Sequence, residues 1–170
     1  MSVPREPEPA PPLRPSGALA AADRPARPGE GRFSAAHRLR GVLVHALLER
    51  LPEVPGERRA EAARRYVEAR APGLSDAVRA DIAAQALGVL ADPRLAPLFG
   101  PGSRAEAPIA GRIVLPGDGG SRAVSGQIDR LLIAPDRVTF ADFKTTARPP
   151  RPDAPVPEAY LAQAALYRDL

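Results

Sequence analysis

The apolar positions in residues 37–51 repeat with the period of an α-helix. Leucine recurs at every fourth position of this segment and forms one apolar face on a helical wheel. The leucines of this face are Leu39, Leu43, Leu47 and Leu51. His45 falls at the edge of the face, beside the positions that pack inward. The pattern therefore predicts an amphipathic helix that carries a histidine next to its buried face.

Two further helices are predicted before residue 92. Residues 57–70 form a polar, charged helical segment. Ser75 is a typical N-cap for a third helix, whose apolar positions continue to about Ala91. Asp92-Pro93 follows, and a residue before proline disfavours helical backbone. The first part of the domain is therefore predicted to be helical.

After residue 100 the pattern becomes typical of β-strands. Residues 107–115, 124–133 and 137–144 are predicted to form three strands. A glycine-rich turn or loop at 116–120 connects the first two. Pro135-Asp136 lies in the short connection between the last two, which indicates a hairpin.

A proline-rich loop and a helix over residues 158–170 complete the pattern. Tyr160, Gln163 and Tyr167 share one face of this helix. Helices on either side of three strands predict an α/β fold, a mixed sheet flanked by helices with an N-terminal helical part. Such a sheet usually has another strand after the last helix. We therefore expect the C-terminal strand to be missing and the chain to be a fragment of a longer protein.

Composition narrows the class of protein. Residues 1–30 are rich in proline and predict a disordered linker, which leaves residues 31–170 as the folded domain. The net charge of +4 suits a polyanionic partner. The absence of cysteine excludes disulfides, zinc–thiolate sites and thiol catalysis. No apolar run approaches the ~18 residues needed to span a bilayer, so we expect no membrane association and a cytoplasmic location.

Lys144 is the single lysine among 24 basic residues. Arginine supplies positive charge everywhere else, so a lone lysine indicates a position that a broad guanidinium would not suit. Asp142 lies two positions earlier, and in a strand both side chains would point to the same face. The pair is consistent with a metal-assisted phosphodiester site. A surface ion pair explains the two residues alone about equally well.

Asp129 and Asp142 both interrupt apolar strands. A carboxylate in such surroundings is costly unless it binds a cation or accepts hydrogen bonds. Two carboxylates on paired strands can converge on one divalent ion, and oxygen ligands favour Mg²⁺. A neutral nitrogen of His45 would shift the preference toward Mn²⁺. Lys144 would then orient the attacking water, help to deprotonate it, or stabilise charge on the phosphate.

Each of these residues also has a purely structural interpretation. His45 could be a packed or surface histidine, and Asp129 could pair with its neighbour Arg130 at a strand edge. Gln163 and Tyr167 could cover a face of the sheet. The order in which the residues occur favours a shared function over these separate explanations.

That order resembles the RecB-type branch of the PD-(D/E)XK nucleases. The resemblance covers roughly residues 38 to 170, and it is strongest to the nuclease domains of AddA-type subunits of helicase–nucleases in double-strand-break repair. Gly-Gln-Ile-Asp-Arg-Leu, Asp-Phe-Lys-Thr and Gln-x-x-x-Tyr are its most specific parts. The matching residues are Gly41, His45, Glu106, Gly126, Asp129, Arg130, Asp142, Lys144, Thr145, Tyr160, Gln163 and Tyr167.

The resemblance implies a restriction-endonuclease-like core and a metal-dependent deoxyribonuclease. The metal ligands that it implies are His45, Asp129, Asp142 and the main-chain carbonyl of Phe143. It assigns catalysis to Asp129, Asp142 and Lys144. It places Gln163, Tyr167, Tyr160 and Arg130 at the DNA, and it gives Glu106 no firm role. The implied cofactor is Mg²⁺, with Mn²⁺ as the alternative.

The implied substrate is single-stranded DNA that a helicase body, or an AddB-like partner subunit, delivers for repair and recombination. The chain has no Gly-x-x-x-x-Gly-Lys-[Ser/Thr] phosphate loop, so ATP hydrolysis is not expected. A catalytically inactive module that binds DNA or a partner is the alternative function. The missing C-terminal strand favours that alternative, and the complete His-Asp-Asp-Lys set opposes it.

Overall fold

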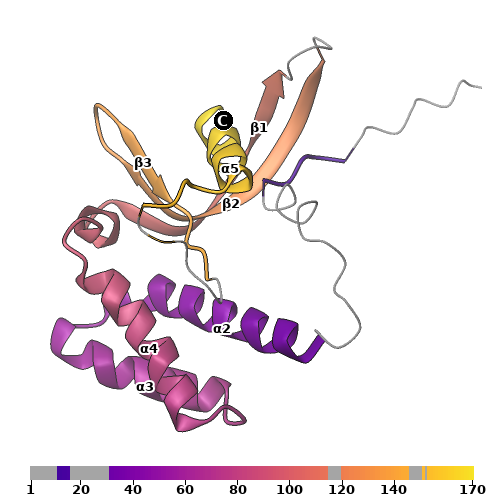
Figure 1. Ribbon diagram of the computed structural model, residues 1–170. Helices are drawn as coiled ribbons and strands as arrows, with labels where there is room; N and C mark the ends of the chain where they lie inside the picture. Colours follow the sequence, from indigo (N-terminus) through magenta and orange to yellow (C-terminus); the bar gives the residue numbers. More distant parts are fainter. Residues whose placement is uncertain (1–10, 16–30, 115–119, 146–150, 152) are drawn as a thin grey trace, which may run out of the picture. The chain divides into compact units, whose positions relative to one another are not determined.

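The computed structural model describes residues 11–15, 31–114, 120–145, 151 and 153–170, with side chains from residue 35 onward in the first helix (Figure 1). The chain divides into two compact units. We call them the helical unit, Pro25–Ala107 with Gln127–Asp153, and the terminal unit, Met1–Arg24 with Pro108–Gly126 and Ala154–Leu170.

Three α-helices form most of the helical unit: α2 (Gly31–Arg50), α3 (Arg59–Arg70) and α4 (Asp76–Ala91) (Figure 1). They confirm the three predicted helices, although α2 begins earlier than residue 37. Short 3₁₀ turns connect or follow them: η1 (Leu51–Glu53), η2 (Gly56–Arg58) and η3 (Ala96–Phe99). None of the helices in the described part of the chain is long and apolar enough to cross a bilayer.

Local signals in the sequence account for the bounds of α4. The Ser75 hydroxyl accepts a hydrogen bond from the Val78 amide at 3.4 Å, which satisfies one of the free amides of the first turn. Asp92 follows the last helical residue and precedes Pro93, which disfavours further helical backbone. The predicted cap and the predicted end are both confirmed.

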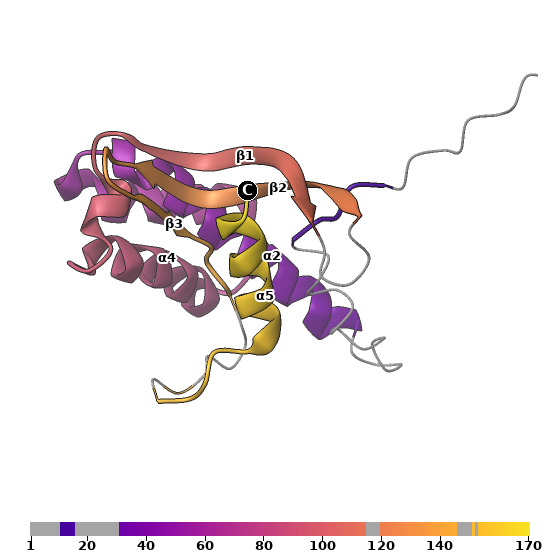
Figure 2. The same cartoon turned by 90° about the horizontal axis from the view of Figure 1, so that it is seen from above.

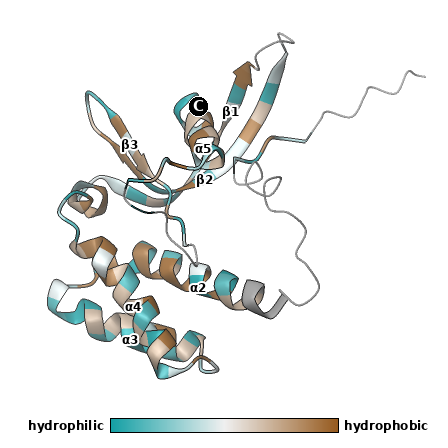
Figure 3. Cartoon of the chain, in the orientation of Figure 1, coloured by the Kyte–Doolittle hydropathy of each residue, from teal (hydrophilic) through white to brown (hydrophobic). Residues whose placement is uncertain are grey.

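The core of the helical unit lies between these helices. Figure 3 shows hydrophobic residues on α2 and α4 and many hydrophilic residues along α3. The buried side chains include Leu43, Val44, Leu47, Leu48, Leu51, Ala63, Val67, Ile82 and Ala86. Most of the predicted leucine face of α2 is thus buried, and this burial holds the helix and its histidine against the rest of the unit.

The sheet has three strands in the order β1-β2-β3: β1 (Ser103–Val114), β2 (Ser121–Ile133) and β3 (Val138–Ala141) (Figure 2). β2 and β3 are antiparallel. The Ala134 amide donates to the Arg137 carbonyl at 2.9 Å and closes the connection between them. This confirms the predicted hairpin and the predicted α/β fold in which helices flank the sheet, although the described strands form an antiparallel sheet where a mixed one was expected.

β3 is shorter than predicted. It ends at Ala141, and residues 142–145 form no regular secondary structure, so the prediction of a strand to residue 144 was wrong. The physical reason is that the Phe143 amide donates to the Asp129 carboxylate at 2.6 Å. Arg130 pairs with Ala141, so the same register would place Asp129 opposite Asp142. The ladder therefore stops where the two predicted site carboxylates begin.

The terminal unit contains α5 (Glu158–Arg168) and a short contact from the N-terminal region. Leu13 forms an isolated parallel bridge with Val124, in which the Leu13 amide donates to the Ala123 carbonyl at 2.8 Å. Composition did not predict this pairing within residues 1–30. The rest of that predicted linker up to residue 30, and most of the predicted loop at 116–120, lie outside the described residues.

Candidate metal centre

His45 on α2 and Asp129 on β2 form the contact around which the candidate site is built. The His45 Nδ1 lies 3.3 Å from the Asp129 Oδ1. The exposed fractions of the two side chains are 30% and 14%, so water screens the contact only in part. The contact confirms that the helix presents His45 at the edge of its buried face, toward the strand that carries Asp129.

Several carboxylates near His45 act on the charge of its ring. The hydrogen bond that His45 donates to the Asp129 carboxylate raises the pKa of His45, although burial of the ring acts in the opposite direction. The carboxylates of Asp129, Glu106 and Asp142 raise this pKa further through their charge. A position that favours a protonated histidine in this way also favours a metal cation, which would compete with the proton for the ring nitrogen.

The second carboxylate oxygen of Asp129 is held by the backbone. The Phe143 amide donates to Oδ2 at 2.6 Å. The Phe143 ring meets the His45 ring edge to face, with centroids 6.5 Å apart. His45, Asp129 and Phe143 thus form one connected group, in which the loop after β3 fixes the orientation of the strand carboxylate.

Glu106 joins this group from β1. Its backbone has a φ of 48°, a left-handed conformation that costs a non-glycine residue about 1–3 kcal/mol. The Gln127 side chain donates to the Glu106 carbonyl at 3.1 Å and supports this turn of the backbone. Burial raises the pKa of the Glu106 carboxyl, and the nearby Asp129 raises it further. Strain and unfavourable burial at one residue are typical of functional positions.

The three side chains offer ligands to a single ion. One ring nitrogen of His45 and one carboxylate oxygen each from Glu106 and Asp129 lie within 4.8 Å of one another. Carboxylate oxygens suit Mg²⁺ and Mn²⁺, and an imidazole nitrogen suits transition metals. The carboxylates that raise the pKa of His45 would also attract a divalent cation. The residues therefore fit a divalent metal ion.

Asp142 and Lys144 form an ion pair beside this group. The side chains of Lys144 and Asp142 are 28% and 18% exposed. The carboxylate of Asp142 is near enough to act on the charge of His45, but it is not one of the three clustered ligands in the described structure. The predicted roles of Asp142 and of the Phe143 carbonyl as metal ligands stay predictions, as does the catalytic role of Lys144.

A close approach of α2 explains the glycine that precedes His45 by one turn. A Cβ atom at Gly41 would lie only 2.8 Å from the Thr145 Oγ1. Glycine is thus the residue that allows Thr145 to lie directly against the helix.

The remaining motif residues of the last helix belong to the terminal unit. Gln163 and Tyr167 are 2% and 7% exposed, and the Gln163 Nε2 donates to the Tyr167 hydroxyl at 3.0 Å. A Cβ atom at Gly126 would lie 3.3 Å from the Tyr167 ring. Tyr160 is half-buried. The predicted contacts of Gln163, Tyr167 and Tyr160 with DNA stay predictions.

Arg130 has an environment that the sequence did not indicate. It is only 5% exposed, and its Nη2 donates to the main-chain carbonyls of Leu48 and Glu49 at 2.6 and 3.1 Å. The sequence suggested an ion pair with Asp129 or a contact with DNA. The burial of Arg130 depends on the end of α2, more than eighty residues earlier, and no local pattern marks that contact.

A comparison with models of protein families identifies the class of the chain. Residues 19–170 match the family model of the PD-(D/E)XK nuclease superfamily. The chain belongs to this superfamily. A comparison with curated proteins gave no match.

Membership in the PD-(D/E)XK superfamily places the described structure in a known class of enzymes. The α/β architecture is consistent with the restriction-endonuclease-like fold of that superfamily. These nucleases use divalent metals, and the cluster of His45, Glu106 and Asp129 could bind one. The superfamily implies nuclease activity and DNA as the substrate.

Proposed function

We propose that this chain is a metal-dependent deoxyribonuclease domain that hydrolyses phosphodiester bonds. The observation that carries the proposal is the cluster of His45, Glu106 and Asp129 with the Asp142–Lys144 pair beside it, in a PD-(D/E)XK chain. The group combines metal ligands and a positive charge, the two elements that phosphodiester hydrolysis requires.

Each residue has a distinct part in the proposed reaction. His45, Glu106 and Asp129 would hold the ion, and Asp142 would be a further ligand. The Phe143 amide keeps the Asp129 carboxylate oriented. A divalent ion held there would supply Lewis-acid chemistry toward the phosphate and the attacking water. Lys144, held by Asp142, stabilises the negative charge that develops on the phosphate or assists the loss of a proton from the attacking water.

The finer proposal concerns the biological setting. The motif order resembles AddA-type nuclease domains, so we propose Mg²⁺ as the cofactor, with Mn²⁺ as the alternative. We propose single-stranded DNA as the substrate, supplied by a helicase body or an AddB-like partner subunit during double-strand-break repair and recombination. The proposed location is the cytoplasm.

A cleavage assay tests this function. The purified chain is incubated with 5′-labelled single-stranded DNA in Mg²⁺, in Mn²⁺ and in EDTA, alongside Asp142→Ala and the remote control Glu57→Gln. Metal-dependent cutting that Asp142→Ala lacks and Glu57→Gln retains would support the proposal. A folded protein that binds DNA without cutting it would instead support a binding module, and equal cutting by Asp142→Ala would refute the assigned site.

A further inference from the structure

Arg130 connects the two sides of the candidate metal centre. It follows Asp129 directly in β2, yet its guanidinium reaches the last turn of α2, where it binds the carbonyls of Leu48 and Glu49. Carbonyls in the last turn of a helix lack intrahelical donors and carry partial negative charge. His45 lies one turn earlier in the same helix. The contact therefore fixes the end of α2, and with it the position of His45, relative to β2.

The same guanidinium also supports Phe143. It lies over the Phe99 ring, 5.1 Å from its centroid. The Phe99 ring stacks on the Phe143 ring, with centroids 6.1 Å apart and an interplanar angle of 7°. Phe143 in turn contacts His45 through its ring and Asp129 through its amide. A second series of contacts thus connects Arg130, through the rings of Phe99 and Phe143, with the proposed ligands His45 and Asp129.

Burying the charge of Arg130 costs free energy. Burial lowers the pKa of Arg130, and the charges of Glu53, Glu106 and Glu49 act in the opposite direction. The Arg130 Nε has no hydrogen-bond partner among the described residues. A buried donor without a partner costs about 1–3 kcal/mol. An incompletely satisfied guanidinium at this point indicates that its position serves the site.

We infer that Arg130 is a positioning residue that holds His45 and Phe143 in place relative to Asp129, and that it does not make the DNA contact expected from the sequence. The inference rests on the proposed function for its link to metal binding. The planar guanidinium matters because it binds two carbonyls at one edge while its face covers an aromatic ring. Lysine retains the charge but cannot make both contacts.

The test compares Arg130→Lys with Arg79→Lys. Arg79 is a matched control, because its Nη1 also binds two main-chain carbonyls, those of Ala71 and Pro72, but it belongs to another part of the helical unit. Mn²⁺ binding is measured by electron paramagnetic resonance, and folding is checked by circular dichroism. Arg130→Lys should weaken Mn²⁺ binding about 10–100-fold, as loss of groups that orient metal ligands generally does, and Arg79→Lys should leave it unchanged.

A second readout does not require metal. The ring proton signals of His45 in metal-free protein report its contact with Phe143, and they should shift in Arg130→Lys while those of His37 stay in place. If Arg130→Lys fails to fold, Phe99→Leu, which removes only the intervening ring, should produce the same shift. Unchanged His45 signals in the folded variant would overturn the inference. Failure of the wild-type protein to bind Mn²⁺ would instead refute the proposed function, and the His45 signals would still decide the role of Arg130.

Discussion

Asp129 is the residue on which the candidate site depends most directly. One of its carboxylate oxygens faces His45 and the other accepts the Phe143 amide. Its side chain thus joins a helix, a strand and a loop. Any divalent ion bound by His45 and Glu106 would share this carboxylate, so changes at Asp129 should affect both electrostatics and geometry.

Asp129→Asn should lower the pKa of His45 and change how stability depends on pH. In the wild-type protein without metal, the folded-state pKa of His45 lies above its ordinary value of 6.5. The stabilisation that this gives is fully present below about pH 6.5 and is lost as the pH rises through the folded-state pKa. Asparagine keeps an acceptor for the Phe143 amide but removes the charge, so this loss should be smaller in the variant.

Two measurements check this prediction. Proton resonances of His45 are followed against pH, with His37→Ala used to assign the two histidines, and urea unfolding is measured across the same pH range. Identical titration curves for His45 in the wild-type protein and Asp129→Asn would show that the carboxylate does not set its pKa.

Lys144→Arg should be almost as inactive as Lys144→Ala in DNA cleavage. The Asp142 carboxylate holds a compact ammonium, and a planar guanidinium would place its charge differently over the phosphate. We expect a loss of about 10²–10³-fold in rate, the usual effect of removing one group that stabilises a developing charge. Mn²⁺ binding should persist in both variants. Full activity in Lys144→Arg would mean that any positive charge suffices.

Two residues of the observed cluster, His45 and Asp129, were among those that the sequence singled out. His45 was recognisable at the edge of an apolar face, and Asp129 as a carboxylate in an apolar strand. The position of Glu106 among the possible metal ligands could not be predicted, because its left-handed backbone arises from the tertiary structure and not from a local preference of glutamate. The burial of Arg130 likewise depends on carbonyls far away in the sequence.

The contact between α2 and the segment after β3 gives a prediction at the scale of elements. Gly41→Ala should destabilise the protein or disturb the site, because the new methyl group would lie 2.8 Å from the Thr145 Oγ1. Gly88 in α4 is the matched control, since nothing lies within 4 Å of a Cβ atom there. Gly88→Ala should stabilise the protein by about 0.5–1 kcal/mol, the usual gain within a helix.

Urea unfolding of the two variants provides the comparison. The double variant Gly41→Ala/Thr145→Ala should recover part of the loss, because it removes the oxygen atom that the methyl group meets. An equal gain in stability for Gly41→Ala and Gly88→Ala would show that the close approach of Thr145 to the helix has no consequence.

The sequence pattern predicted the ends of the helices more accurately than the end of β3. The helices follow local signals, an apolar face in α2 and a serine cap in α4. Their ends were predicted closely, except that α2 begins at Gly31 and not at residue 37. The end of β3 was not, because the Asp129 side chain takes the Phe143 amide that a longer ladder would have used. Competition of this kind between a side chain and the backbone cannot be read from alternation of residues alone.

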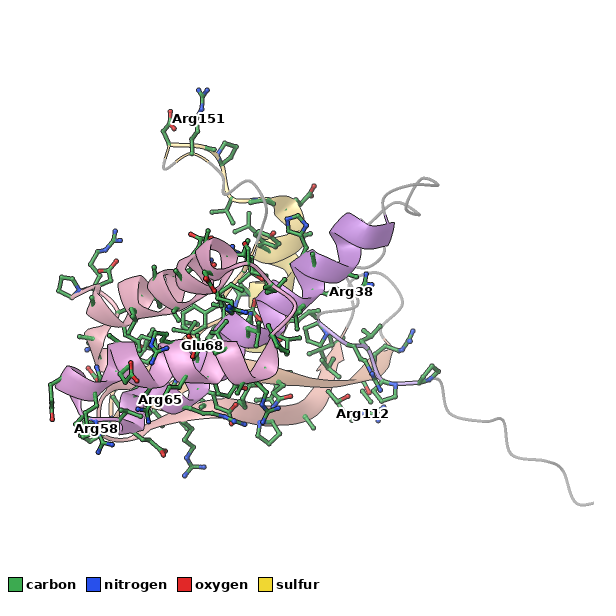
Figure 4. The ribbon with its side chains drawn as sticks, turned by 90° about the horizontal axis from the view of Figure 1, so that it is seen from below. Arg38, Arg58, Arg65, Glu68, Arg112 and Arg151 are labelled. Atoms are coloured by element: carbon green, nitrogen blue, oxygen red, sulfur yellow. The ribbon has the colours of Figure 1, made fainter. Side chains whose placement is uncertain are left out.

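The charge of the whole molecule gives a prediction about DNA. The chain carries a net charge of +4, and its exposed arginines include Arg38, Arg58, Arg65, Arg112 and Arg151, labelled in Figure 4. Arginine contacts with phosphates release counterions from DNA. The affinity for single-stranded DNA should therefore fall steeply with salt, with a slope of about −0.7 per phosphate contact in a logarithmic plot.

Fluorescence anisotropy of labelled DNA measures this dependence, with EDTA present to prevent cleavage. Asp142→Ala should show nearly the same slope as the wild-type protein, because it removes a proposed catalytic group and leaves the exposed arginines in place. An affinity that does not change between 50 and 200 mM salt, a range over which phosphate contacts ordinarily weaken strongly, would argue against phosphate binding.

The proposed function requires His45, Glu106 and Asp129 together to hold one divalent ion. Calorimetric titration with Mn²⁺ tests it most directly, using the wild-type protein, His45→Ala, Glu106→Gln, Asp129→Asn and the remote control Glu57→Gln. We predict one bound ion per chain, affinity reduced at least about 10-fold in each of the three site variants, and no change in the control. Equal Mn²⁺ binding by the wild-type protein and all three site variants would contradict the account.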